Sequence, residues 1–163
     1  MVRKEVILNM KSNSLSVRYK TEQDIVPEKI SVGDWIDLRA TERLVLQEGE
    51  EAVIHLGIAM ELPEGYEAHV APRSSTFRKW GIIQTNSVGI IDNSYCGDND
   101  EWMMEVICLK PRDELDGVKC SIINPGDRVC QFRIMPSQPK IEFIKVNTLG
   151  NPDRGGFGST GHN

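Results

Sequence analysis

The feature that most constrains the fold is a series of short β-type runs, with almost no sustained helical periodicity between them. Apolar or alternating runs bounded by Gly, Pro, Asn or Asp are typical of strands. They cover Val6–Met10, Leu15–Tyr19, Ile36–Ala40, Ala52–Met60, Tyr66–Ala71, Gly89–Ile91, Met103–Leu109, Val118–Ile123, Val129–Met135 and Ile141–Val146. Many short strands at this spacing predict an all-β protein with a closed or double-sheet architecture, which hides the unpaired edges of a flat sheet.

One segment predicts a helix. Residues Ser74–Trp80 follow Pro72, offer Ser or Thr as an N-cap and stop at Gly81. Arg78 and Lys79 near the end of this segment would interact favourably with the helix dipole. We therefore expect one short helix of one or two turns inside an otherwise β-structured domain.

Length and charge narrow the possibilities further. A chain of 163 residues is expected to form one domain, here a β domain over residues 1–148 followed by a mobile, glycine-rich arm over residues 149–163. Lys and Arg number 19 against 24 Asp and Glu, and a net charge of −5 argues against duplex binding through phosphate neutralisation. Without a membrane-length apolar run or a signal peptide, we predict a soluble, cytoplasmic protein that binds neither nucleic acid nor a membrane.

Cysteine and histidine give little indication of chemistry. The cysteines form no C-x-x-C pair and have no histidine at zinc-ligand spacing, so we expect reduced, partly buried thiols and no structural zinc. They are Cys96, Cys108, Cys120 and Cys130. No serine or cysteine motif accompanies His55, His69 or His162, which argues against a histidine-based dyad or triad.

The tail carries the first candidate site. The run Arg154-Gly155-Gly156-Phe157-Gly158-Ser159-Thr160-Gly161 combines a guanidinium, glycines, hydroxyls and an aromatic ring. Glycines let backbone N–H groups approach an anion, Arg forms a fork for phosphate oxygens, and Phe offers a face for a base. The run is therefore either a nucleotide-binding lid or a flexible linker, and it is not a Walker A loop.

Two further clusters stand where predicted strands end. In Ala71-Pro72-Arg73-Ser74-Ser75, a capped helix start explains the serines but not Arg73, so an anion site at the helix N-terminus is the alternative. In the run from Gly89 to Asp98, Asp92 directly follows two isoleucines and precedes Tyr95. An acid there is either a turn former or a general base. Asp37 and Gln131 each lie in a strand-like run and are either site residues or plain surface.

Taken in order, these five clusters resemble the five motifs of the homotrimeric dUTP diphosphatase (dUTPase) family, over about four-fifths of the chain. The resemblance implies a distorted β jelly roll that assembles as a homotrimer, with active sites shared between subunits and a C-terminal motif that closes over a neighbour's site. The implied hydrolase reaction converts dUTP to dUMP and pyrophosphate by water attack on the α-phosphorus. It keeps uracil out of DNA and supplies dUMP for dTMP synthesis. Mg²⁺ is expected to be held mainly by the triphosphate.

The resemblance also implies roles for individual residues. Asp92 corresponds to the acid that deprotonates the attacking water, and Tyr95 to the aromatic that packs under the deoxyribose and excludes a 2′-hydroxyl. The uracil-reading hairpin corresponds to Asn86, Gly89, Ile90 and Ile91. Arg73, Ser74 and Ser75 correspond to the second motif, whose serines contact the phosphates, and Gln131 to the fourth-motif residue near the α-phosphate. In the last motif, Ser159 and Thr160 correspond to phosphate-binding hydroxyls beside the substrate-binding Gly158, and Arg154 to the arginine that clamps the γ-phosphate. Phe157 corresponds to the ring that stacks on uracil, and Asp37 to an acid that reaches magnesium through water.

Four positions depart from the family pattern or fall outside it. Trp35 replaces the usual glycine of the first motif, and Arg154 lies three residues before Phe157 instead of five, which shortens its reach by roughly 7 Å. Trp102 either forms a second lid face beside Phe157 or packs in the core. Arg128 is expected to pair with an acid and not to bind substrate.

Two alternatives to a dUTPase stay open. The first is a dCTP deaminase-like enzyme of the same fold, which would need a proton-shuttling glutamate at the base. The spacing from Asp92 to Tyr95 favours the diphosphatase. The second is a regulatory binding protein switched by the nucleotide, because the motifs that bind are also those that catalyse.

Overall fold

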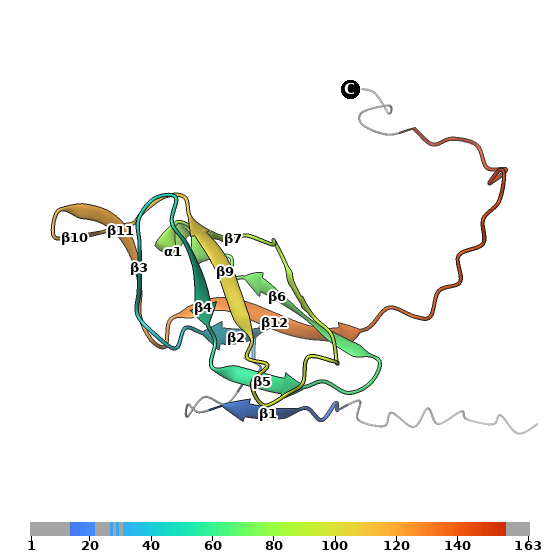
Figure 1. The fold of residues 1–163 in the computed structure, drawn as a ribbon, viewed down its shortest axis with the longest axis horizontal. Coiled ribbons are helices and arrows are strands. Elements are labelled where there is room, and N and C mark those ends of the chain that lie inside the picture. The colour runs from blue at the N-terminus through green and yellow to red at the C-terminus, as the bar shows by residue number, and fades with distance from the viewer. Residues whose placement is uncertain (1–13, 22–26, 28, 30, 156–163) are drawn as a thin grey trace, which may run out of the picture.

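The computed structural model describes residues 14–21, 27, 29 and 31–155, and these residues form β-strands with one short helix (Figure 1). The strands are β1 (Arg18–Thr21), β2 (Ile36–Arg39), β3 (Leu44–Leu46), β4 (Glu51–His55), β5 (Ile58–Glu61), β6 (Tyr66–Pro72), β7 (Ile82–Gln84), β8 (Gly89–Ile91), β9 (Met103–Cys108), β10 (Asp113–Leu115), β11 (Val118–Ile123) and β12 (Arg128–Pro136). The helix is α1 (Thr76–Trp80). The prediction of an all-β domain with one short helix is confirmed.

The strands form small antiparallel sheets. The four-stranded sheet has the order β2-β12-β6-β8, and a three-stranded sheet has the order β4-β9-β7. The remaining sheets are β10-β11-β3 and the pair β1-β5. Because β12 pairs with β2 on one side and β6 on the other, segments far apart in the sequence become neighbours at the centre of the largest sheet.

The core lies between the four-stranded sheet and the three-stranded sheet β4-β9-β7. Val70 and Phe132 enter it from the four-stranded sheet, and Ile54 and Met104 from the three-stranded one. Trp102 is fully buried among them, with its ring 5.2 Å from that of Phe132 in an edge-on contact. Of the two alternatives for Trp102, core packing is therefore correct and the second lid face is wrong, because a side chain with no exposed surface cannot cover a substrate.

Some predicted elements need correction. The predicted strand Ala52–Met60 is two strands, β4 and β5, because Gly57 between them takes a left-handed φ of 65°. The helix begins at Thr76, two residues later than predicted. The sequence analysis missed strands β3, β7 and β10, whose three residues each are too few to establish an alternation. It did predict β8, which has the same length. Val6–Met10 lies outside the described residues.

The predicted strand Ile141–Val146 is wrong, since the chain there pairs with no described strand. After β12 ends at Pro136, residues 137–155 run away from the body as an extended segment, here called the arm (Figure 1). Phe143 is 90% exposed and Ile144 75% exposed on this segment. The arm therefore carries apolar side chains into solvent. The domain boundary after residue 148 stays a prediction.

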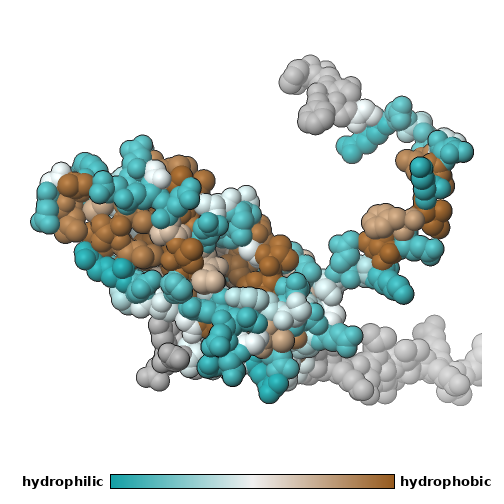
Figure 2. Space-filling view, viewed as in Figure 1, coloured by the Kyte–Doolittle hydropathy of each residue, from teal (hydrophilic) through white to brown (hydrophobic). Residues whose placement is uncertain are grey.

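A second apolar surface lies on the body. Figure 2 shows apolar side chains gathered over the part of the molecule built from β3, β4, β9 and β11. Exposed members of this surface, here called the apolar face, are Val45, Val53, Met103, Leu115 and Val118. Single exposed apolar residues are ordinary, but a contiguous patch commonly marks an interface.

Candidate active site

Three of the predicted motifs meet in the four-stranded sheet. The register places Gln131 of β12 opposite Asp37 of β2 on one side and opposite Ala71 of β6 on the other. Arg73 follows β6 immediately. The sheet order, and not the sequence order, therefore brings the first, second and fourth motifs side by side.

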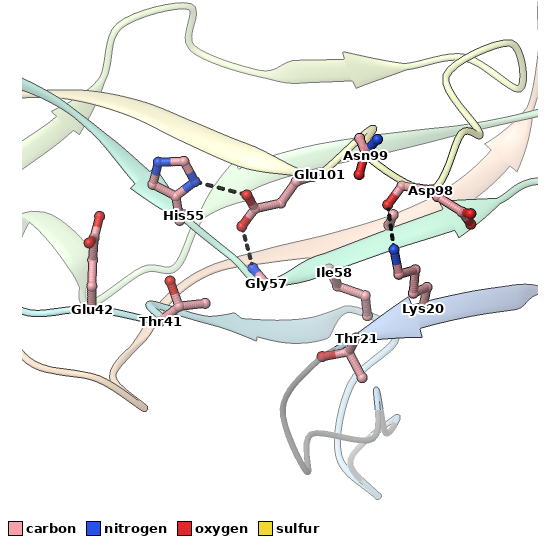
Figure 3. Close-up of a pocket in the computed structure, with 11 residues that line it drawn as sticks. Lys20, Thr21, Thr41, Glu42, His55, Gly57, Ile58, Asp98, Asn99 and Glu101 are labelled. Atoms are coloured by element: carbon pink, nitrogen blue, oxygen red, sulfur yellow. Dashed lines mark hydrogen bonds and ion pairs between the residues drawn. The ribbon is translucent and has the colours of Figure 1, made fainter.

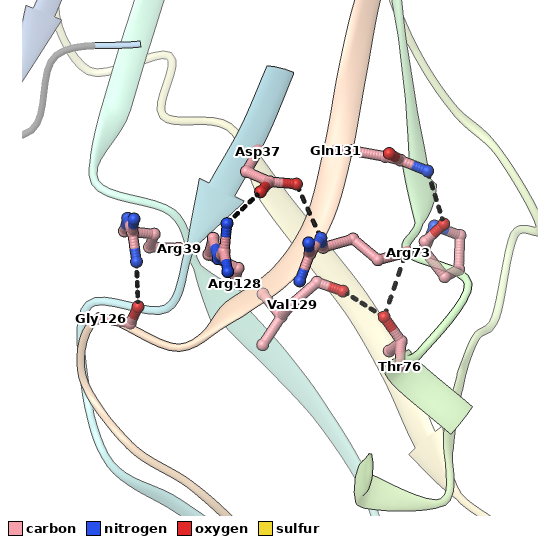
Figure 4. Close-up of polar contacts among 9 residues, drawn as sticks. Asp37, Arg39, Arg73, Thr76, Gly126, Arg128, Val129 and Gln131 are labelled. Atoms are coloured by element: carbon pink, nitrogen blue, oxygen red, sulfur yellow. Dashed lines mark hydrogen bonds and ion pairs between the residues drawn. The ribbon is translucent and has the colours of Figure 1, made fainter. Parts of the chain in front are cut away.

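Asp37 binds two arginines at this place (Figure 4). Its Oδ1 lies 2.7 Å from Nε of Arg73, and its Oδ2 lies 3.1 Å from a terminal nitrogen of Arg128. The side chains of Asp37 and Arg73 are mostly buried, at 13% and 21% exposure, whereas Arg128 is 44% exposed. The predicted pairing of Arg128 with an acid is confirmed. Both carboxylate oxygens of Asp37 contact guanidinium groups, so its water-mediated contact with magnesium stays a prediction.

The start of α1 is fixed by a threonine. The hydroxyl of Thr76, which is fully buried, accepts a hydrogen bond from the backbone N–H of Arg73 at 3.0 Å and donates to the carbonyl of Val129 at 2.8 Å (Figure 4). Ser75 occupies the N-cap position but makes no side-chain capping bond. Since α1 has only five residues, its dipole offers little to an anion. The phosphate contacts that the resemblance implied for this motif stay a prediction.

Gln131 lies next to this group. Its Nε2 donates to the carbonyl of Pro72 at 3.3 Å, which holds the half-buried carboxamide against the end of β6 (Figure 4). The structure therefore places Gln131 against Pro72, the residue before Arg73. Its predicted contact with a phosphate stays a prediction.

The third motif begins where β8 ends. The Oδ1 atom of Asp92 accepts hydrogen bonds from the backbone N–H of Ser94, at 2.8 Å, and from the Ser94 hydroxyl. These bonds, the hydroxyl one first, hold the pKa of Asp92 below its ordinary value of 3.8. Asp92 is therefore an exposed, oriented carboxylate at neutral pH, and its Oδ2 can accept a proton from a bound water.

The loop that carries Tyr95 is anchored to the body by a glutamate that the sequence analysis did not single out. The Tyr95 hydroxyl donates to the carbonyl of Glu101 at 3.1 Å. The two carboxylate oxygens of Glu101 bind Nδ1 of His55 and the backbone N–H of Gly57, each at 2.8 Å (Figure 3). The hydrogen bond from Glu101 is the main cause that raises the pKa of His55 above 6.5. His55, Gly57 and Glu101 line a pocket of about 400 Å³, and Lys20 lines it as well.

The predicted uracil-reading hairpin is a turn between two sheets, because β7 pairs with β9 and β8 pairs with β6. We call residues 85–88 the β7–β8 turn. Asn86 lies in this turn, and Gly89, Ile90 and Ile91 form β8 directly after it. Ser87 adopts a left-handed φ of 63° there. No sequence pattern indicated that the arms of this hairpin pair with different strands, since that depends on long-range partners.

One chain does not bring all of these groups together. Ile91 pairs with Ala68, which precedes Arg73 by five residues along β6. At about 3.3 Å per residue, the Asp92 end of β8 lies roughly 16 Å from Arg73. Arg154 is exposed on the arm, and the arm runs away from the body (Figure 1). The predicted tail residues Phe157, Gly158, Ser159 and Thr160 lie outside the described residues.

The described residues also include the four cysteines of the chain. Cys108, Cys120 and Cys130 are buried free thiols and Cys96 is an exposed one, as predicted. Burial first, and then the charge of Asp37, raises the pKa of Cys130 to about 12. Among the described residues no three His, Cys, Asp or Glu side chains are grouped to hold a metal, and no described helix has the length and hydropathy to cross a membrane.

Known proteins resemble this chain along most of its length. The dUTPase family model matches residues 28–111. The SPbeta prophage-derived deoxyuridine 5'-triphosphate nucleotidohydrolase YosS of Bacillus subtilis is 50% identical over 147 residues, which are 90% of this chain and 97% of that protein. The deoxyuridine 5'-triphosphate nucleotidohydrolase of Clostridium acetobutylicum is 36% identical, over 91% of this chain and 97% of that protein.

Solved structures agree on the fold. A variant of the dUTPase of Staphylococcus bacteriophage 80alpha, solved with dUpNHpp, matches with a TM-score of 0.70 at 22% identity, over 90% of this chain and 98% of that one. A variant of the dUTPase of phage phi11 of S. aureus, described with a structural Mg(II) ion, gives 0.68 over 82% of this chain and 98% of that one, also at 22% identity. The predicted jelly-roll fold is confirmed, and the chain belongs to the dUTPase family.

Proposed function

We propose that this protein is a hydrolase that converts dUTP to dUMP and pyrophosphate. The observation that carries this proposal is the carboxylate of Asp92, held by Ser94 at the end of β8 and followed by Tyr95, in a chain half identical to a deoxyuridine 5'-triphosphate nucleotidohydrolase. The reaction would remove dUTP before uracil enters DNA and would supply dUMP for dTMP synthesis.

In this mechanism Asp92 orients a water through Oδ2 and accepts its proton as the oxygen attacks the α-phosphorus. The bond between that phosphorus and the oxygen bridging to the β-phosphorus breaks, and pyrophosphate leaves with the bridging oxygen. Arg73 supplies a fixed positive charge toward the phosphates. Tyr95, anchored through Glu101, lies under the deoxyribose and excludes a 2′-hydroxyl.

Magnesium fits this site as a partner of the substrate. Because no three acids or histidines are grouped among the described residues, the ion would be carried mainly by triphosphate oxygens and water, as Mg²⁺ commonly is in nucleotide sites. The phi11 relative is described with a structural Mg(II) ion. When bound, the ion neutralises charge on the phosphates. Asp37 could reach it only through water, since both of its oxygens contact arginines.

The active site is proposed to be shared within a homotrimer. The roughly 16 Å between the Asp92 end of β8 and Arg73 supports a site in which one copy supplies the base-side residues and another the phosphate-side residues. The apolar face and the exposed Phe143 and Ile144 of the arm support packing against further copies. In such an assembly the tail from Arg154 to Thr160 closes over a neighbour's site, with Phe157 on the uracil.

A complementation experiment tests the shared site. Asp92→Asn and Arg73→Ala should each abolish most turnover when tested alone. Co-refolded in equal amounts, they should recover about a quarter of wild-type activity, because one pairing in four joins an intact Asp92 with an intact Arg73. No recovery, in mixtures shown to contain both variants in one assembly, would place both residues in a site built from a single chain.

The activity itself is tested with parallel substrates. Pyrophosphate release is measured from dUTP, dCTP, dTTP and UTP, with magnesium and then with EDTA, while ammonia from dCTP is monitored. We expect release from dUTP alone, and only with magnesium. Ammonia from dCTP would support the deaminase alternative, and inactivity throughout the regulatory one. Neither alternative is favoured by the comparisons.

The buried free thiols support the cytoplasm as the compartment.

A further inference from the structure

We propose that Gln84 determines base specificity by fixing which end of the Asn86 carboxamide faces the base. This inference rests on the proposed function, in which the β7–β8 turn reads uracil. Gln84 is the last residue of β7, and only 5% of its surface is exposed. It touches the base-reading turn from behind, so it acts as a positioning residue and does not contact substrate itself.

The side chain of Gln84 joins the two large sheets. Its Nε2 donates to the carbonyl of Val70 in β6 at 3.3 Å and to Oδ1 of Asn86 at 2.8 Å. The same nitrogen packs behind Gly89, where an added Cβ would lie 3.4 Å from it. Gln84 thus lies between β6 and the β7–β8 turn, where the chain passes from the sheet β4-β9-β7 to the sheet β2-β12-β6-β8.

The orientation of both amides follows from one backbone group. The Val70 carbonyl can only accept a hydrogen bond, so Gln84 must direct its NH₂ group toward it. The second hydrogen of that NH₂ group then needs an acceptor, which is Oδ1 of Asn86. This orientation has a cost, because the buried Oε1 of Gln84 has no hydrogen-bond partner among the described residues. Turning the Gln84 amide over would place this oxygen against a carbonyl, which is worse.

The consequence for recognition is a fixed hydrogen-bond donor. With Oδ1 bound to Gln84, the exposed Asn86 presents its Nδ2 hydrogens to a ligand. Uracil carries an acceptor, O4, where cytosine carries the donor N4. A fixed amide donor therefore favours uracil. With cytosine bound, the N4 donor would face the Nδ2 donor of Asn86. The base selection that Gln84 makes through Asn86 would add to any selection made by the backbone of β8.

Two substitutions test this inference. Gln84→Met keeps the volume and removes the donor, so the Asn86 amide can rotate. The ratio of kcat/KM for dUTP over dCTP should fall about tenfold to a hundredfold. Gln84→Glu places an acceptor against Asn86, which should then turn its Nδ2 inward and expose Oδ1. The ratio should fall further, and dCMP should bind more tightly than it does to the wild type. Binding of dUMP and dCMP by calorimetry gives a readout independent of turnover.

Gln47→Met is the matched control, because it makes the same exchange at an exposed glutamine outside the β7–β8 turn. It should leave the ratio unchanged, and discrimination against UTP, which depends on Tyr95, should be unchanged in every variant. An equal loss on dUTP and dCTP in folded Gln84→Met would make Gln84 merely structural and overturn the inference. If the wild type does not hydrolyse dUTP, the proposed function has failed. If it does and the ratio does not move, only the role of Gln84 has failed.

Discussion

Replacing Asp37 by Asn tests whether this residue acts through Arg73 or through magnesium. The substitution keeps the shape and removes the charge that Arg73 and Arg128 share. At the Arg73 contact, an ion pair becomes a hydrogen bond from the guanidinium to a neutral amide oxygen, a loss of about 1 to 1.5 kcal/mol. The Arg128 pair is half exposed and adds at most about 1 kcal/mol. The free energy of unfolding should therefore fall by about 1 to 2.5 kcal/mol.

The assay combines thermal unfolding with kinetics. For a chain of this length the loss corresponds to a decrease in Tm of about 2 to 10 °C. Because Arg73 loses the partner that orients it, KM for dUTP should rise, while the magnesium concentration for half-maximal activity should not change. The matched control is Asp34→Asn, which removes an exposed partner of Lys29 at 2.8 Å and should change none of these quantities.

The opposite pattern would refute this reasoning. If Asp37→Asn leaves Tm and KM as in the wild type but raises the magnesium requirement, the carboxylate acts on the ion through water and its arginine contacts are incidental.

The other predictions concern the base, the thiols and pH. Asp92→Asn should lower turnover by about 10² to 10⁴ while keeping the affinity for a non-hydrolysable dUTP analogue, and near-normal turnover would reassign the base. Iodoacetamide should modify the exposed Cys96 alone in the native protein, and early labelling of Cys130, whose pKa is raised to about 12, would contradict its burial. Glu101 raises the pKa of His55, so this contribution to stability is present below pH 6.5 and lost as pH rises through the raised value. The Tm advantage of wild type over His55→Gln should therefore shrink as the pH rises above 6.5, and a constant difference would contradict the pairing.

The sequence by itself determined the features that depend on neighbours along the chain. Alternation within short runs predicted most strands, and the spacing from Asp92 to Tyr95 predicted the third motif, because both are set by a few consecutive residues. Some runs of three residues, such as β3, escaped because they are too short to establish a period. The strand predicted at Ile141–Val146 failed for the converse reason: its composition suits a strand, but the described chain offers it no partner.

Only the tertiary structure decided which distant residues meet. Asp37 contacts Arg73 and Arg128 because β12 lies between β2 and β6, and no local pattern encodes that order. The burial of Trp102 and the Glu101 contact with His55 likewise depend on how the sheets pack. Gln84 is an ordinary strand residue in the sequence. It controls the Asn86 amide only because a carbonyl of β6 lies within hydrogen-bonding distance, and such partners are set by long-range register.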